Sequence, residues 1–330
     1  MYEIKKENQV LVSVCVMAYN HAKFISQNLE SILKQKTNFP FEVIIGEDES
    51  TDGTREICIE YAKKYPEKIH LFLRNRKDNI YKYGQPTGRF NFIQNIKVAQ
   101  GKYIAIIDGD DYWPDELKLQ KQVDFLENNL DYSFVSCRSD ILTQKTGELK
   151  SMYDDVFSDG KNKIITENNF LSPFLPLTAT LLFRKKCLDK INYNALSFGH
   201  TMIIFHLLQS GNGCCINEKM SVYRIQGEGI WNSASEYLND KKTYFFTIDL
   251  LTIYKKELNS LKDFHASAFK KAFWNAFENK KTKDIFQIAF AELRLALIGF
   301  NNYFFFIIKT FPVYLKKIIM RELPEKTSKI

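Results

Sequence analysis

The sequence of 330 residues has little of what marks several classes of protein. Its 14 glycines and 8 prolines are too few for a collagen-like or low-complexity chain. No apolar run reaches the roughly 18 residues that a membrane-spanning helix needs. The closest run, Tyr303 to Ile308, stops at Lys309. The N-terminal residues lack the apolar core of a signal peptide, so we expect a cytoplasmic protein.

The cysteines and histidines show no metal-binding pattern. None of the six cysteines forms a C-x-x-C pair, and the adjacent Cys214 and Cys215 are a poor start for a structural disulfide. We therefore expect reduced thiols in a reducing compartment. His21, His70, His206 and His265 show no ligand spacing with one another. We interpret these four histidines as surface or packing residues.

Charge is unevenly distributed along the chain. The net charge is +7, but residues 241–330 hold 17 Lys/Arg against 8 Asp/Glu, which is +9, and residues 1–240 carry −2. A basic and aromatic C-terminal part favours contact with an anionic surface, either phospholipid or nucleic acid. The basic residues are scattered along helices and no nucleic-acid motif is present, so we do not expect nucleic acid as a partner.

The first half of the chain alternates apolar runs with helical periodicity. We predict strands at residues 10–18, 41–45, 69–73, 103–107 and 133–137, and helices at 22–35, 55–64, 90–99 and from Pro114 onward. Strands separated by helices of this length indicate an α/β fold with a mostly parallel sheet. We further predict strands at 178–183 and 220–225, a polar loop at 151–169 and a helix at 200–210. From about Glu236 the pattern is helical to the end. We expect an α/β domain at 1–235 and an α-helical C-terminal region at 236–330.

Strongly polar residues follow the predicted strands. Tyr19 follows the first strand, Glu47 and Asp48 follow the second, and Asp108 and Asp110 follow the fourth. Parallel strands present their carboxyl ends at one edge of the sheet, so these side chains should converge there. Carboxylates bind a nucleotide diphosphate through a divalent cation. The pattern therefore predicts a site for a metal ion and a nucleotide.

Three segments carry a family resemblance. In order along the chain they read VSVCVMAYNHAKFISQNLESIL, FEVIIGEDESTDGT and GKYIAIIDGDDYW. This ordered set resembles the family 2 glycosyltransferases of GT-A (Rossmann-like) fold. Weaker similarity continues to about Trp231. The resemblance implies a nucleotide-sugar donor, a Mn²⁺ or Mg²⁺ ion, and inversion at the anomeric carbon.

The resemblance also implies roles for single residues. Tyr19 lines the nucleobase, Asp48 hydrogen-bonds the base, and Glu47 replaces a commoner Asp beside it. Asp108 and Asp110 form an Asp-x-Asp motif in which Asp110 is the preferred metal ligand. Asp111 orients the donor sugar or a metal-bound water. Trp113 is expected to pack beneath this loop.

The sequence departs from the family pattern at two positions. The helix that normally opens with Gly-Asp, where the acid is the general base, opens here with Gly199-His200. Histidine can act as a base at neutral pH, so His200 is either the catalytic base or a histidine without a catalytic role. A histidine usually follows the late Tyr-Arg pair, and Gln226 stands there instead. Arg224 of that pair is expected to contact a diphosphate oxygen or to form a structural ion pair.

These observations leave more than one function open. The favoured interpretation is a metal-dependent, inverting enzyme that transfers a sugar, from UDP by family frequency, to a hydroxyl of a glycan or lipid-linked glycan in bacterial surface polysaccharide synthesis. The alternative is a nucleotide-sugar binding subunit without turnover, as His200 and Gln226 suggest. A nucleotidyltransferase is disfavoured because no Gly-rich phosphate loop follows the first strand.

The last thirty residues raise a separate question. Residues 300–320 read FNNYFFFIIKTFPVYLKKIIM, with aromatics first and Lys316, Lys317 and then Arg321 after them. Such a segment either lies at an anionic membrane surface, which would make the protein peripheral at the inner face of the membrane, or packs against the catalytic domain or a second copy.

Overall fold

A computed structural model describes residues 10–82, 85–171, 175–189, 191, 199–226, 236–254 and 259–297. The chain divides into two compact units, Met1–Ser233 and Ala234–Ile330. The first unit is built on a sheet and the second on helices.

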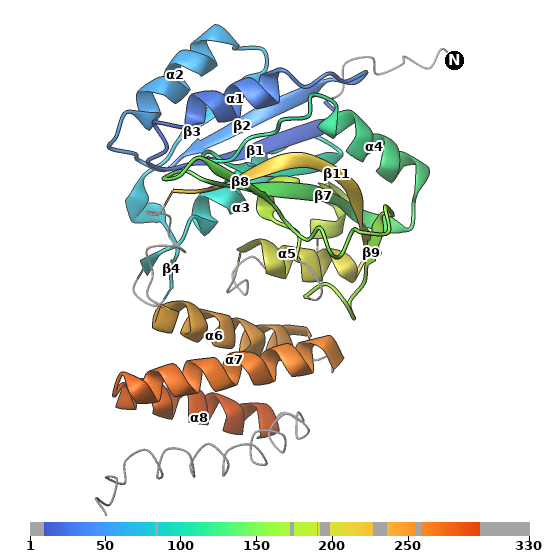
Figure 1. Ribbon diagram of the computed structural model, residues 1–330. Coiled ribbons are helices and arrows are strands. Elements are labelled where there is room, and N and C mark those ends of the chain that lie inside the picture. The colour runs from blue at the N-terminus through green and yellow to red at the C-terminus, as the bar shows by residue number, and fades with distance from the viewer. Residues whose placement is uncertain are drawn as a thin grey trace, which may run out of the picture. The chain divides into compact units, whose positions relative to one another are not determined.

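The described part of the first unit holds a nine-stranded sheet (Figure 1). In spatial order the strands are β3 (Ile69–Leu73), β2 (Phe41–Glu47), β1 (Val12–Ala18), β6 (Tyr103–Asp108), β10 (Leu182–Arg184), β7 (Tyr132–Thr143), β11 (Asn212–Ile225) and β9 (Lys163–Ile165), with β8 (Glu148–Ser151) paired to β7. The first four strands are parallel. β10 runs antiparallel to both of its neighbours, whereas β11 is parallel to β7. A separate hairpin joins β4 (Tyr81–Lys82) to β5 (Gln85–Pro86).

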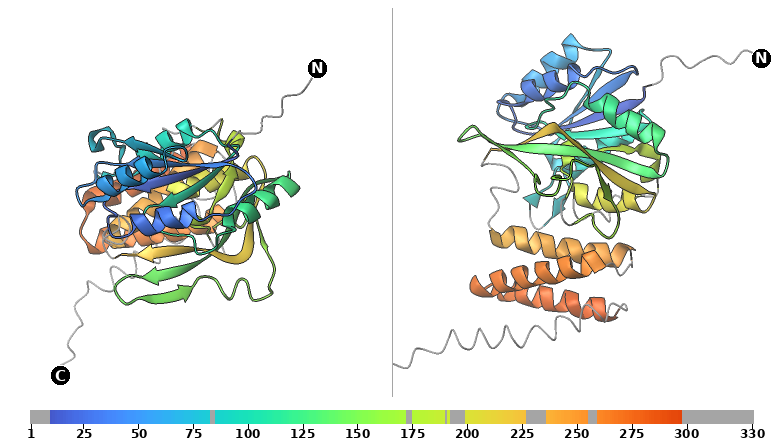
Figure 2. Two further views of the ribbon diagram at one scale, coloured as in Figure 1. Left: turned by 90° about the horizontal axis from the view of Figure 1, so that it is seen from above. Right: turned by 45° about the vertical axis from the view of Figure 1, so that its right-hand side comes forward.

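Helices cover both faces of this sheet (Figures 1 and 2). One face carries α1 (Ile25–Leu33), α2 (Thr54–Lys64) and α4 (Lys118–Asn128), and the other carries α3 (Arg89–Val98) and α5 (Gly199–Leu208). β1 is almost wholly apolar because both of its faces are covered: Val12, Val14 and Val16 pack with α1 on one side. The expected α/β architecture with a mostly parallel sheet is therefore confirmed.

Several predicted boundaries were wrong, and β7, for example, runs on to Thr143 rather than ending at Cys137. Residues Thr178–Thr180 form a 3₁₀ turn, η2, and only Leu182–Arg184 pair as a strand. The helix expected from Pro114 begins at Lys118, and the residues before it form an Asx turn in which the Asp115 carboxylate accepts the Leu117 N–H at 2.8 Å. β11 begins at Asn212 rather than 220, and the segment predicted as loop contains β9. Two further 3₁₀ turns are η1 (Arg76–Asp78) and η3 (Lys185–Leu188).

The second unit contains α6 (Glu236–Tyr254), α7 (Asn259–Glu278) and α8 (Thr282–Leu297), as the helical pattern predicts. Its core includes polar groups that satisfy one another. The Tyr244 hydroxyl donates to Glu292 at 2.7 Å, and Thr247 Oγ1 lies 2.6 Å from His265 Nδ1. No helix in the described ranges is long and apolar enough to cross a bilayer.

Candidate active site

The parallel register brings the predicted polar residues to one edge of the sheet. β1 lies between β2 and β6, with Ala18 paired to Glu47 and Met17 paired to Asp108. The residues that follow these strands therefore lie side by side. The structure thus places the Asp48 turn and the loop Asp108–Asp111 at the same carboxyl edge.

Asp48 is 2% exposed, and one of its two carboxylate oxygens is held by neighbouring side chains. Oδ2 accepts hydrogen bonds from Arg76 Nη1 and Asn79 Nδ2, each at 2.8 Å. Oδ1 is buried and has no partner within the described residues. Burial raises the pKa of Asp48, although Arg76 and Asn79 oppose the shift. A buried acceptor with a free oxygen is suited to an N–H donor of a ligand.

Tyr19 lies beside this carboxylate. The Arg76 guanidinium lies over its ring, 3.6 Å from the ring centre. Arg76 therefore joins the two residues that the sequence assigned to the nucleobase. Sequence reasoning missed Arg76 and Asn79, although they follow β3 just as the predicted residues follow their own strands.

Glu47, which the sequence places at the nucleotide site beside Asp48, is held by neighbouring groups of the chain. Its side chain is fully buried, with Oε2 in an ion pair with Arg55 Nε at 2.5 Å. Oε1 accepts the backbone N–H of Ser50 at 2.7 Å. Both oxygens are engaged inside the chain, so Glu47 stabilises the turn after β2, and the geometry gives no support to direct nucleotide contact.

The loop Asp108–Asp111 is fixed from below by Asn28 of α1. The Asn28 amide donates to the carbonyl oxygens of Asp108 at 3.0 Å and Asp111 at 2.9 Å. The Asp111 N–H closes the turn onto the Asp108 carbonyl at 3.0 Å. Asn28 is buried and was not singled out from the sequence, because its partners are backbone atoms of a loop 80 residues away.

The three acids of this loop differ in burial and contacts. Asp110 is partly exposed, and within the described residues its side chain contacts the amide of Gln226 and, at 3.8 Å, His21 Nε2. Burial and the charge of Asp110 raise the pKa of Asp108 to about 7. Asp111 is 2% exposed and accepts the Arg224 N–H at 2.9 Å. Burial, Asp110 and Asp108 together raise its pKa well above the usual range.

Arg224 holds this loop in place. Nε donates to the Asp110 carbonyl at 2.8 Å, Nη2 to Gln27 Oε1 at 2.7 Å, and Nη1 to Gln144. The residue is 5% exposed. Either contact with a diphosphate oxygen or a structural ion pair was predicted for Arg224. In the structure each of its three guanidinium nitrogens donates to an acceptor within the chain, so Arg224 helps to position the loop, and diphosphate contact stays a prediction.

His21 also belongs to this site, although the sequence gave it no role. Its imidazole packs against Gly109, where an added Cβ would lie 2.8 Å from Nδ1. Only glycine leaves room for the ring at that point of the loop. His200 lies in the first turn of α5, and its side chain is outside the described residues. Trp113 packs beneath the loop as expected, 3% exposed, with Nε1 donating to the Ala179 carbonyl at 2.8 Å.

The site supplies some, but not all, of the ligands that a divalent cation needs. No group of three or more His, Cys, Asp or Glu side chains within the described ranges is arranged to hold a metal ion. Asp108 and Asp110 nevertheless lie in one loop, and within the described ranges no lysine or arginine side chain is paired to either carboxylate. Mg²⁺ and Mn²⁺ are hard cations that take carboxylate and phosphate oxygens together, so the residues fit a metal that is completed by a substrate diphosphate.

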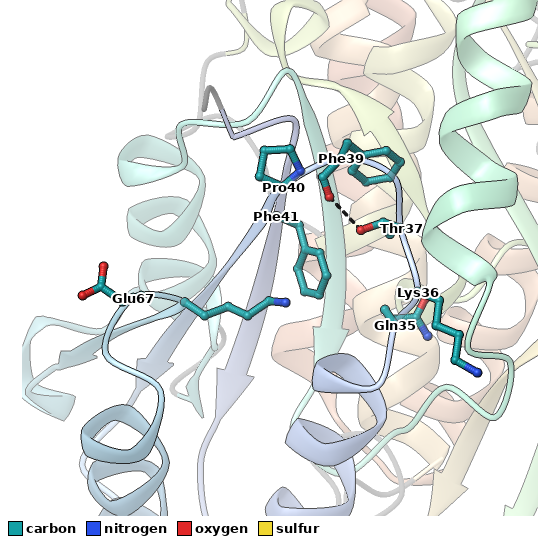
Figure 3. Close-up of a pocket in the computed structure, with 8 residues that line it drawn as sticks. Gln35, Lys36, Thr37, Phe39, Pro40, Phe41 and Glu67 are labelled. Carbon is teal, nitrogen blue, oxygen red and sulfur yellow. Dashed lines mark hydrogen bonds between the residues drawn. The ribbon is translucent and has the colours of Figure 1, made fainter. Parts of the chain in front are cut away.

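A groove lies elsewhere in the first unit (Figure 3). It has a volume of about 620 Å³ and lies between the end of α1 and the amino ends of β2 and β3. Lys68 lies over the Phe41 ring there at 3.6 Å. This groove is at the opposite ends of the strands from Asp48 and Asp110, so it is separate from the candidate active site.

Curated relatives of the chain come from several bacteria. An uncharacterized protein of Mycobacterium tuberculosis is 30% identical over 230 residues, which cover 68% of this chain and 61% of that protein. The chain thus spans about three-fifths of the length of its mycobacterial relatives. A second relative is TuaG of Bacillus subtilis, which is named as a glycosyltransferase of teichuronic acid biosynthesis. It is 36% identical over 125 residues, which cover 38% of this chain and 45% of TuaG.

Solved structures share the fold at low sequence identity. A crystal structure of Staphylococcus aureus TarS 1–349 in complex with UDP-GlcNAc has a TM-score of 0.58 at 18% identity, covering 84% of this chain and 79% of that one. The mannosyltransferase PcManGT of Pyrobaculum calidifontis, in complex with GDP-Man and Mn²⁺, has a TM-score of 0.50 at 16% identity, covering 92% and 80%. These likenesses establish the GT-A type of fold.

The model of the family described as "Glycosyl transferase family 2" matches residues 13–192. That range includes β1, the Asp48 turn and the whole loop Asp108–Asp111, which form the candidate active site. The chain belongs to glycosyl transferase family 2.

Proposed function

We propose that this chain is a metal-dependent glycosyltransferase that moves a sugar from a nucleotide diphosphate to a hydroxyl group. The observation that carries the proposal is the convergence of Asp48 and Asp110 at one sheet edge. Asp48 offers a buried, unpartnered acceptor for a base, and Asp110 offers an accessible carboxylate for a cation. The complexes of TarS with UDP-GlcNAc and of PcManGT with GDP-Man and Mn²⁺ support this assignment.

In the proposed mechanism the residues of the chain bind and orient the donor. Tyr19 and Arg76 lie against the nucleobase, and Asp48 Oδ1 accepts one of its N–H groups. Asp110, with Asp108, would hold Mn²⁺ or Mg²⁺, which supplies positive charge that offsets the diphosphate. Asn28 and Arg224 keep the loop in place through its carbonyl oxygens. Asp111, whose carboxylate accepts the Arg224 N–H, would orient the donor sugar or a water bound to the metal.

We propose inversion by a single in-line displacement. His200, at the start of α5, takes the proton of the acceptor hydroxyl as that oxygen attacks the anomeric carbon. The bond from the anomeric carbon to the diphosphate oxygen breaks in the same step, and the nucleoside diphosphate leaves. In this proposal residues 1–235 are the catalytic domain and residues 236–330 are a separate C-terminal region.

The acceptor is proposed to be a glycan or lipid-linked glycan of a bacterial surface polysaccharide. The teichuronic acid assignment of TuaG supports this class of acceptor. The six cysteines are free thiols, which suits a chain at the cytoplasmic face of the membrane. The aromatic and basic segment 300–320 would meet anionic lipid there.

One observation favours a second candidate, a nucleotide-sugar binding subunit without turnover. Gln226, at a position where the family usually has histidine, contacts Asp110. Such a subunit would bind the donor but leave it intact.

A donor panel separates the two candidates. UDP-, GDP- and dTDP-sugars are incubated with the full-length chain and Mn²⁺ or Mg²⁺, with and without membrane lysate as acceptor source, and released nucleotide is measured. The enzyme proposal expects release from one donor class that requires metal and increases with lysate. Calorimetric binding of a donor with no release under any condition would establish the binding subunit instead.

A further inference from the structure

Helix α8 presents a stripe of aromatic and basic residues to solvent. We call Lys283, Phe286, Phe290 and Arg294 the outer face of α8. Their spacings of three, four and four residues place them along one side of the helix. Phe286 and Phe290 are each 70% exposed, the highest exposure among the aromatic side chains described as exposed. Two large rings one turn apart form a continuous apolar patch rather than scattered exposure.

The opposite side of α8 already supplies the core of the second unit. Ile288 and Leu295 are fully buried, and Glu292 is 3% exposed where it accepts the Tyr244 hydroxyl. α8 packs against α6 and α7 through this side. The outer face is therefore not needed to hold the three helices together.

The charges on α8 are divided between its two sides. The two acidic residues of α8 do not belong to the outer face. Asp284 pairs with Lys241 at 2.6 Å, and Glu292 is buried. The cations remain: Lys283 and Arg294 flank the two rings, and neither lies within ion-pairing distance of a carboxylate in the described part of the chain. Lys280 and Lys281 add exposed charge in the turn before the helix.

We propose that the outer face of α8 binds the surface of an anionic lipid bilayer. The two rings lie at the boundary between headgroups and acyl chains, and Lys283 and Arg294 meet lipid phosphates beside them. A second copy of the chain is a poor occupant, because two such faces would bring like charges together. Exposed phenylalanine pairs suit a lipid interface better than the phosphate backbone of a nucleic acid.

The sequence beyond the described residues continues the same chemistry. Residues 300–320 hold six Phe or Tyr in their first twelve positions and further cations after them. The proposal concerns α8 itself and does not depend on the donor or on catalysis. It rests on the proposed function only for its purpose, which is to bring the active site to a lipid-linked acceptor.

Sedimentation with vesicles tests the proposal on the full-length chain. Vesicles of phosphatidylcholine with about one-quarter phosphatidylglycerol are compared with phosphatidylcholine alone, at low and high salt. We expect binding to the anionic vesicles that weakens with salt. The double variant Phe286→Ser/Phe290→Ser should bind about tenfold more weakly or worse, and Lys283→Gln/Arg294→Gln should lose most of the salt dependence.

Matched controls remove apolar area or charge elsewhere. Leu130→Ser/Leu149→Ser changes two exposed leucines of the first unit, and Lys63→Gln/Lys161→Gln removes two exposed cations there. Both should bind vesicles as the wild type does. UDP titration should be unchanged in every variant, so a failure of lipid binding leaves the glycosyltransferase proposal standing.

Three results would overturn the lipid assignment. Wild-type vesicle binding by the phenylalanine variant would show that the rings do not meet lipid. A lowered melting temperature with unchanged vesicle binding would show that another part of the chain covers them. A loss of oligomer in light scattering, again with unchanged vesicle binding, would make the outer face a contact between copies.

Discussion

Lys118 is fully buried at the start of α4, and no described carboxylate forms an ion pair with it. Its Nζ donates to Gln122 Oε1 at 2.6 Å and lies 4.1 Å from the centre of the Trp113 ring. Burial lowers the pKa of Lys118 from 10.5 to about 8. Below pH 8 the folded chain therefore carries a desolvated charge, which lowers the free energy of unfolding by roughly 3 kcal/mol.

We expect Lys118→Met to raise the free energy of unfolding at pH 7 by about 1–2 kcal/mol, since the lost bond to Gln122 offsets part of the gain. Between pH 8 and 10.5 the unfolded lysine keeps a proton that the folded one releases, so wild-type stability rises with pH. The difference in the free energy of unfolding between Lys118→Met and wild type should therefore shrink by about 1 kcal/mol between pH 7 and 9.

Urea unfolding at the two pH values measures this difference. Lys63→Met, on the exposed side of α2, is the control and should show no such change. An advantage of Lys118→Met that stays constant with pH would mean that the buried amine keeps its ordinary pKa.

Asp48 gives the second prediction at the residue scale. Replacing it with asparagine keeps its shape but puts an amide where Oδ1 would accept an N–H of the base. We expect UDP affinity to fall by about tenfold to a hundredfold, the equivalent of a lost hydrogen bond of roughly 1.5–3 kcal/mol to a charged group. Isothermal titration measures the loss, with the exposed Asp78→Asn of η1 as control. Equal affinity of Asp48→Asn and wild type would remove Asp48 from the site.

Site residues were predictable from sequence where strand order alone decides their place. Asp48 and Asp110 follow strands, so their convergence needs only a parallel sheet. Glu47 and Arg224 lie at the carboxyl ends of β2 and β11, but their contacts with Arg55, Gln27 and the Asp110 carbonyl form only in the folded chain. Pattern reasoning could not separate a residue that faces the ligand from one that supports it.

At the scale of elements, α5 carries the prediction about the base. It begins at Gly199, and His200 is its second residue. If His200 is the base, His200→Ala should reduce turnover by roughly 10²–10⁴-fold, with a smaller effect on donor affinity. His200→Asp restores the acid of the family pattern and should retain or raise activity. His206→Gln, in the last turn of the same helix, is the control.

Full turnover by His200→Ala would show that another group takes the acceptor proton. The pH dependence distinguishes the variants further. Activity of the wild type should fall as the pH drops and the histidine gains a proton, whereas that of His200→Asp should persist to lower pH.

Elements with strong periodicity were predicted well, and those set by tertiary pairing were not. β1, β3 and α2 follow from apolar runs and caps, and their bounds lie within two residues of the prediction. β11 extends back to Asn212 through the polar stretch Asn217–Lys219, because β7 provides hydrogen-bond partners despite shifts in register. Such pairing is invisible in the sequence of one strand.

At the scale of the whole molecule, charge and composition already separate two kinds of chain segment. The apolar strands and their acidic loop ends lie in residues 1–240, and the excess of cations lies beyond them. The charge distribution therefore suggests different roles for the two parts, with the basic part favouring an anionic surface. It did not indicate which helix faces outward, because that depends on which side of α8 packs against α6 and α7.

The central claim is that a metal ion held at Asp110 joins the chain to a nucleotide diphosphate, and one titration tests it directly. UDP is titrated into wild type and Asp110→Asn, each with Mn²⁺ and with chelator, and Asp124→Asn on α4 serves as the control. We predict that Mn²⁺ strengthens UDP binding about tenfold or more in wild type and control. Asp110→Asn, folded by circular dichroism, should lose that gain. A gain from Mn²⁺ that survives in Asp110→Asn would contradict the account.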